Sequence, residues 1–389
     1  MRLMVAWMAR GLKMTPNGRA RLRPSRRRSH RRMEAAGNPR LARRLALPSA
    51  WAVACIAVLL ASDRAHAADL QEFARTGVFE EQVRWVTLGS GVRVYVNAPE
   101  VVEAGRPTRV IVYATPNGNT LEQTLGGAKG AGVDWHFDIQ HVAAQVRRLR
   151  EVNQRENIVL AVTQAPKLSW PAFRAGNAEA GKVIQSVIEL AKEGLTGSRV
   201  SVDLTGHSGG GSFIFGFINS VEAIPDWVGR IAFLDANYSY DEAAGHGDKL
   251  LAWLRGDAAR RLVVIAYDDR EITLDGKKVV GPTGGTFRAT GRMVERLKKE
   301  GAVSEASEGA FTVYSAEGGR VWCFVHANPE NKILHTALVG EMNGLLQAEA
   351  LGTPEEGRWG TFGGPRAYER WMAAALTVTA AASDRKSVV

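Results

Sequence analysis

The sequence predicts an α/β fold in which a mostly parallel sheet of about eight strands carries helices on both faces. From residue 82 onward, short runs rich in β-branched residues alternate with longer segments of helical apolar spacing. Several of the runs end in acidic residues, and a glycine-rich turn joins one run directly to an apolar helix. Parallel strands need long crossover connections, usually helices, so this alternation favours a parallel sheet that is buried on both faces.

The composition is that of a globular domain and does not indicate a nucleic-acid binder. The chain has 389 residues, 45% of them hydrophobic, which is enough for one large core. Its formal net charge is +10, but residues 1–67 hold 15 Lys and Arg against two acidic residues. The rest of the chain therefore carries a net charge of −3, and without a basic excess to neutralise phosphates the case for a nucleic-acid binder is removed.

Residues 1–67 have the pattern of a basic leader that ends in a secretory signal peptide. Arg43 and Arg44 precede an apolar run at 45–61, and the small-residue cleavage pattern Ala-His-Ala follows at 65–67. The run is shorter than the roughly 20 apolar residues of a membrane-spanning helix. We therefore expect a secreted or periplasmic protein with no stable membrane insertion after signal cleavage.

Alternatives stay open for the leader. The chain could start at Met33, and twin-arginine export or lipoprotein processing at Cys55 are further options. The folded domain is predicted over 68–383, with Cys323 as its one cysteine and hence no internal disulfide. The final residues 384–389 match a translated sequencing adapter, and we interpret them as an artefactual tail.

The elements follow one another in a regular order. A hairpin is expected around Gly89-Ser90-Gly91, and Asp275-Gly276 predicts a second, short hairpin outside the sheet at 272–280. The absence of repeats and low-complexity linkers favours one domain. The expected strands are 82–88, 92–97, 108–114, 157–162, 199–204, 230–234, 261–267, 311–314 and 321–325, and the expected helices are 139–151, 178–192, 213–218 and 336–348.

The glycine-rich turn is Gly206-His207-Ser208-Gly209-Gly210, between strand and helix. A G-x-S-x-G motif is weak evidence alone, but here glycines on both sides of the serine permit the sharp turn that exposes its hydroxyl. The sequence has neither a G-x-G-x-x-G run nor the Lys-Ser/Thr pair of a P-loop, which argues against a phosphate-binding turn. The motif predicts Ser208 as a nucleophile.

With this turn, the acid-ended strands behind it and a late histidine, residues 82–350 resemble the α/β-hydrolase superfamily, without a narrower family. The resemblance implies a triad in the chain order Ser, acid, His. It favours His335, before the final helix, as the general base, with His326 as the alternative. For the acid it favours Asp269, after the next-to-last strand, with Asp268 and Asp235 as alternatives.

The resemblance also implies an oxyanion hole built from the residue after the nucleophile and from the loop after strand 108–114. The expected donors are the N–H groups of Gly209 and Asn119, with Asn117 in the same loop. Trp170 could line the substrate pocket. The sequence has no H-E-x-x-H spacing, so neither a metal nor another cofactor is expected.

The predicted activity is hydrolysis of a carboxylic ester through an acyl-enzyme, on a small-molecule or polymeric substrate. Two alternatives stay open. A peptidase or amidase would use the same triad, because the triad alone does not choose the leaving group. A secreted binding module that retains the fold would use the cleft without chemistry.

Overall fold

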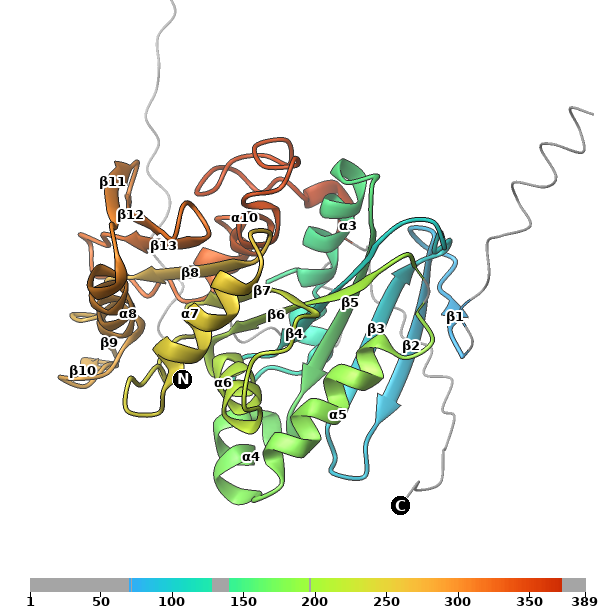
Figure 1. Ribbon diagram of the computed structural model, residues 1–389, viewed down its shortest axis with the longest axis horizontal. Coiled ribbons are helices and arrows are strands. Elements are labelled where there is room, and N and C mark those ends of the chain that lie inside the picture. Colours follow the sequence, from blue (N-terminus) through green and yellow to red (C-terminus); the bar gives the residue numbers. More distant parts are fainter. Residues whose placement is uncertain (1–69, 71, 128–139, 196, 373–389) are drawn as a thin grey trace, which may run out of the picture. The chain divides into compact units, whose positions relative to one another are not determined.

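The computed structural model describes residues 70, 72–127, 140–195 and 197–372 (Figure 1). The predicted leader at 1–67 and the tail at 384–389 lie outside these residues. Within the described part of the chain, no helix has both the length and the apolar character needed to cross a membrane.

The centre of the fold is one large sheet with the strand order β1-β2-β3-β5-β4-β6-β7-β8-β13-β12-β11. The strands from β5 to β13 in this order run parallel, and antiparallel strands extend the sheet at both ends. The bounds are Ala74–Arg75 (β1), Glu81–Thr87 (β2), Arg93–Pro99 (β3), Thr108–Ala114 (β4), Asn157–Gln164 (β5), Val200–His207 (β6), Val228–Leu234 (β7), Arg261–Tyr267 (β8), Ser304–Glu308 (β11), Phe311–Ala316 (β12) and Val321–His326 (β13).

The predicted fold class is confirmed, but the sheet has 11 strands rather than about eight. The two edge strands, β1 and β11, account for most of the difference. All of their residues are exposed and β11 reads Ser-Glu-Ala-Ser-Glu, so neither strand has the apolar alternation that marks a strand in a sequence. Charged, exposed edge strands also protect a sheet from pairing with another chain.

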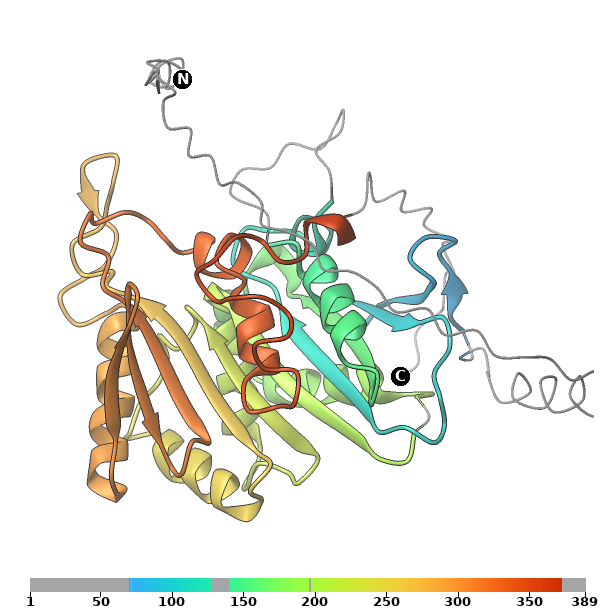
Figure 2. The same ribbon diagram turned by 90° about the horizontal axis from the view of Figure 1, so that it is seen from above.

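Helices cover both faces of the sheet (Figure 1 and Figure 2). One face packs against α4, α5, α6, α7 and α8, and the other against α2, α3, α9 and α10. The bounds are Leu121–Leu125 (α2), Val142–Val152 (α3), Trp170–Gly176 (α4), Ala180–Lys192 (α5), Gly211–Ser220 (α6), His246–Gly256 (α7), Thr286–Glu300 (α8), Ala337–Gly340 (α9) and Gly344–Ala350 (α10).

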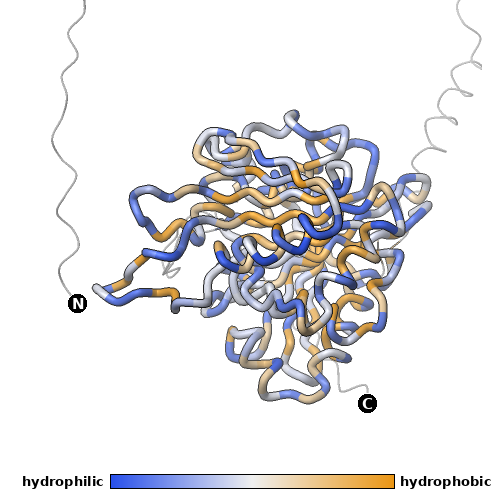
Figure 3. The backbone as a smooth tube through the Cα atoms, turned by 60° about the vertical axis from the view of Figure 1, so that its left-hand side comes forward, coloured by the Kyte–Doolittle hydropathy of each residue, from blue (hydrophilic) through white to orange (hydrophobic). Residues whose placement is uncertain are grey.

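The strands alternate between the two cores. In β4, Val110 and Val112 face the first core, whereas Ile111 and Tyr113 face the second, and all four are fully buried. Figure 3 shows the apolar residues gathered in the strands, with polar residues in the surrounding loops. Because β4, β6, β7 and β8 are parallel, their carboxyl ends lie at one edge of the sheet.

Two local predictions are refined. The segment 272–280 forms the small antiparallel hairpin of β9 (Thr273–Leu274) and β10 (Lys277–Lys278), outside the main sheet as expected. The expected final helix 336–348 is divided into α9 and α10 because Asn343 adopts a left-handed conformation, with φ of 63°.

Candidate active site

The turn after β6 holds Ser208 in a conformation that is rare for a residue with a side chain. Its φ is 54°, in the left-handed region. A short 3₁₀ segment, Ser208–Gly210, leads directly into α6, and the serine is partly exposed while its neighbours are buried. This strand–turn–helix geometry lifts the hydroxyl out of the sheet, as a nucleophile elbow requires.

Close approach of neighbouring backbone explains the glycines of this turn. A Cβ on Gly206 would lie 2.8 Å from the carbonyl carbon of Gly210. A Cβ on Gly210 would overlap the carbonyl oxygen of Ala114, at the end of β4. The elbow is therefore tightly packed against itself and against β4, and a side chain at either position would force the backbone to move.

His335 lies beside the elbow because His207 holds it there. Nε2 of His207 donates a hydrogen bond to the carbonyl oxygen of His335 at 2.9 Å, and the two ring centroids are 4.4 Å apart. Burial lowers the pKa of His207 well below its usual value, with a smaller effect from His335, so His207 stays neutral.

The imidazole of His335 pairs with Asp235. Nδ1 of His335 hydrogen-bonds Oδ2 of Asp235, at the end of β7. Asp235 is fully buried, its φ is 48°, and its N–H donates to the carbonyl oxygen of Ile265 at 2.6 Å. The structure thus brings His335 to Asp235, the alternative acid, and not to the preferred Asp269.

The other two candidate acids have other partners. Asp269 accepts a hydrogen bond from the backbone N–H of Thr286 at 2.7 Å, at the start of α8. Burial raises the pKa of Asp269, and the nearby Asp235 adds to this effect. Asp268 forms an ion pair with Arg270 at 2.6 Å, and this hydrogen-bonded pair lowers the pKa of Asp268.

The alternative base, His326, contacts residues at the start of β12 and in the loop after β13. Its ring packs edge-on against Phe311, with centroids 5.1 Å apart, and its Nδ1 accepts a hydrogen bond from the N–H of Asn328 at 3.0 Å. Burial lowers its pKa. These contacts fix the end of β13 and the loop after it, which leads to His335.

The loop after β4, which was expected to supply an oxyanion donor, reaches the elbow. The side-chain amide of Asn117 lies directly against Gly209, where a Cβ would overlap it. The N–H of Gly118 is used, because it donates to the carbonyl oxygen of Leu168 at 2.9 Å. Asn119 is partly exposed in the same loop. The arrangement brings Asn117 close to Gly209, whereas the sequence favoured Asn119.

The expected role of Trp170 in the substrate pocket is not supported. Its side chain is 1% exposed and packs against Phe213 and Phe173, with ring centroids 4.8 Å and 5.8 Å away. The ring belongs to the core between α4 and α6. Among the described residues, Tyr238 is an exposed aromatic residue near the site: it is 40% exposed and lies three residues after Asp235.

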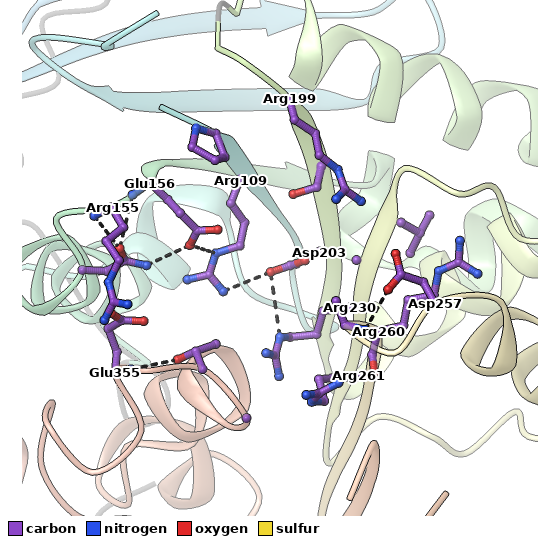
Figure 4. A pocket seen from close by; sticks show the side chains of 18 of the residues that line it. Arg109, Arg155, Glu156, Arg199, Asp203, Arg230, Asp257, Arg260, Arg261 and Glu355 are labelled. Carbon is purple, nitrogen blue, oxygen red and sulfur yellow. Dashed lines mark hydrogen bonds and ion pairs between the residues drawn. The ribbon is translucent and has the colours of Figure 1, made fainter. Parts of the chain in front are cut away.

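A separate cavity of about 470 Å³ lies at the opposite edge of the sheet, among the amino ends of β4, β6, β7 and β8 (Figure 4). Six arginines line it, and five of them donate hydrogen bonds to other groups of the chain. Arg109 donates to Asp203 at 3.3 Å, and Arg230 donates to two carbonyl oxygens at the end of α10, at 2.7 and 2.8 Å. We interpret this cluster as an ion network that fastens α10 to the sheet.

Glu349 is buried beside this network. Thr205, on β6, donates its hydroxyl proton to Oε1 of Glu349 at 2.6 Å. Burial raises the pKa of Glu349 to about 8, and the neighbouring Asp203 adds to the effect. Within the described residues, no group of three or more His, Cys, Asp and Glu side chains is placed to hold a metal ion.

The strand order and the elbow give the chain an α/β-hydrolase fold. No family model and no curated protein matches the sequence. The chain is similar to the feruloyl esterase module from Clostridium thermocellum at 8% identity and a TM-score of 0.42, over 74% of this chain and 92% of that one. It is similar to an acetyl xylan esterase from Aspergillus awamori at 12% identity and a TM-score of 0.36, over 63% of this chain and 92% of that one. It is similar to prolyl oligopeptidase B from Galerina marginata at 11% identity and a TM-score of 0.31, over 72% of this chain and 37% of that one.

Proposed function

We propose that this protein is a serine hydrolase that cleaves carboxylic esters through an acyl-enzyme. The observation that carries the proposal is the elbow conformation of Ser208 together with His335, which packs against the neighbouring His207 and is paired with the buried Asp235. Nucleophile, base and acid are the three groups that acyl transfer to water requires.

Each group has a defined role in the proposed reaction. Oγ of Ser208 attacks the ester carbonyl while Nε2 of His335 takes its proton, and Asp235 stabilises the imidazolium that forms. His335 then gives the proton to the departing alkoxide as the C–O bond breaks. A water molecule, deprotonated by the same histidine, attacks the acyl-enzyme and releases the carboxylic acid and the free serine.

The charge that develops on the carbonyl oxygen needs donors close to Ser208. The N–H of Gly209 lies in the 3₁₀ segment that leads into α6, and backbone N–H groups at the start of a helix favour negative charge. The second donor comes from the loop after β4, either the side-chain amide of Asn117 or the N–H of Asn119. The contact between Asn117 and Gly209 favours Asn117.

We further propose that the protein acts outside the cytoplasm, as the pattern of its first 67 residues indicates, and that its substrate is a small-molecule or polymeric ester. Tyr238 is the proposed aromatic contact for that substrate. Amide cleavage by the same triad and binding without chemistry are the competing functions.

Hydrolysis of p-nitrophenyl acetate by the purified protein tests the proposal. Ser208→Ala and His335→Ala should each lower kcat at least a thousandfold with the fold retained by circular dichroism. His326→Ala is the matched control for the base and should keep most of the activity. Inactivity of the folded wild-type chain on esters of several chain lengths, together with turnover of peptide amides, would assign it to the peptidases instead.

A further inference from the structure

Two buried carboxylates meet at a single hydroxyl group below the proposed triad. The hydroxyl of Thr286 hydrogen-bonds Oδ1 of Asp235 and lies 3.3 Å from Oδ2 of Asp269. The side chains of Asp235 and Asp269 are both buried, and Thr286 is fully buried. Like charges this close repel each other, so the arrangement needs donors to the carboxylates or a proton on one of them.

The donors to Asp269 come from the start of α8. This helix has Gly285 as its N-cap residue, which offers no side chain to accept the first backbone N–H groups. Asp269, two residues after the end of β8, serves as the cap instead, because its Oδ2 accepts the N–H of Thr286 at 2.7 Å. A Cβ on Gly285 would lie 2.5 Å from both carboxylate oxygens of Asp269, so the close approach requires glycine. Asp269 is thus the cap of a helix that belongs to another part of the chain.

The consequence for Asp235 is a fixed orientation. Its Oδ2 accepts from His335 and its Oδ1 from Thr286, so donors hold the carboxylate on both sides. Thr286 has one hydroxyl proton, and Asp269 already accepts a backbone N–H. The hydroxyl proton is therefore available to Asp235, whose other oxygen faces the base.

We propose that Thr286 and Asp269 are positioning residues of the active site. Asp269 fixes the first turn of α8, and that turn carries the hydroxyl that aims Asp235 at Nδ1 of His335. This inference rests on the proposed function. Neither residue touches the reacting atoms, so both act through Asp235.

The proposal has a signature in the pH profile. A donor to Asp235 stabilises the unprotonated His335–Asp235 pair, which carries one negative charge, and removing the donor raises the proton affinity of the pair. Hydrogen bonds to charged groups are strong enough to move the acidic limb of kcat/KM upward by about one pH unit. A change that only loosened the packing of α8 would lower activity without moving this limb.

The test compares substitutions on the same face of α8. Thr286→Val should lower kcat about tenfold to a hundredfold with little change in KM, and should move the acidic limb upward by about one pH unit. Thr286→Ser, which restores the hydroxyl, should return the limb to its wild-type position. Thr290→Val is the matched control, because Thr290 lies one turn later and its hydroxyl accepts from Asn237 at 3.0 Å.

Asp269→Ala completes the test as a double-mutant cycle with Thr286→Val. If Asp269 acts through Thr286, the double variant should lose no more activity than Thr286→Val alone. Two results would overturn the positioning role alone, provided that Ser208→Ala abolishes the activity. One is additive losses in the double variant, and the other is a pH profile of Thr286→Val that is identical to that of Thr290→Val. Full activity of Ser208→Ala would instead overturn the proposed function.

Discussion

The assignment of Asp235 as the triad acid makes a sharp prediction for Asp235→Asn. Thr286 donates to Oδ1 of the wild-type side chain, so the amide oxygen of the variant should stay on Thr286. Its NH₂ group then faces Nδ1 of His335. An imidazole that accepts a hydrogen bond at Nδ1 carries its proton on Nε2, and that nitrogen can no longer take the proton of Ser208.

The expected loss is large. The same exchange in serine proteases forces the wrong tautomer and lowers kcat about 10⁴-fold, which corresponds to about 5.5 kcal/mol of transition-state stabilisation. We expect a loss of about 10³- to 10⁴-fold in kcat for Asp235→Asn, because this carboxylate is likewise fully buried.

Asp269→Asn is the matched control. An amide oxygen at this position can still accept the N–H of Thr286, so the start of α8 keeps its cap. We expect less than about a tenfold loss of kcat, since the amide conserves the contact that Asp269 makes. The assay is hydrolysis of p-nitrophenyl acetate near pH 8, with thermal melts of both variants. The assignment is refuted if Asp269→Asn loses the thousandfold and Asp235→Asn retains activity.

Three further predictions concern stability. Gly210→Ala should cost at least about 2 kcal/mol of unfolding free energy by urea titration, because its Cβ would overlap the carbonyl oxygen of Ala114. Trp170→Ala should cost about 3–5 kcal/mol in the same titration with an unchanged KM for its ester substrate, since the ring packs in the core and not in the pocket. Glu349 has a pKa raised from 4.5 to about 8 in the fold, so its contribution is complete below pH 4.5 and is lost as the pH rises towards 8. Glu349→Gln should therefore reduce the loss of stability between pH 5 and 8, by up to ~1.4 kcal/mol per pH unit. Urea titrations at pH 5 and pH 8 measure this loss in both proteins, and an identical pH dependence would contradict the prediction.

The sequence predicts the central sheet well because the signals there are local. Runs such as Val110-Ile111-Val112 are apolar on both faces and β-branched, which is typical of a strand buried between two layers of helices. The turn at Ser208 is likewise predictable, since only glycine tolerates the close backbone contacts around it.

The choice of acid could not be made from the sequence. Asp235 and Asp269 both follow buried parallel strands, so both reach the same edge of the sheet. Which of them meets His335 depends on the path of the loop between β13 and α9, and on the start of α8, which binds Asp269. These are contacts between segments far apart in the chain, and no local pattern encodes them.

The expectation that Trp170 lines the substrate pocket failed for a similar reason. The sequence does not show whether an aromatic residue lines a pocket or packs in the core. In the structure Trp170 is the first residue of α4, and its ring packs against Phe213. The role of His207 was also hidden, because its partner is a backbone carbonyl 128 positions later. The contact of this buried histidine with the ring and the carbonyl oxygen of His335 is defined only by the three-dimensional structure.

The central claim is that Ser208 is an activated nucleophile, and covalent labelling tests it most directly. A fluorophosphonate probe should add one phosphonyl group to the folded protein, and peptide mass spectrometry should place that group on Ser208. Ser208→Ala should remain unlabelled, and His335→Ala should be labelled much more slowly, because the base that removes the serine proton is missing. A folded wild-type protein that resists the probe, or one that is labelled at another residue, would contradict the account.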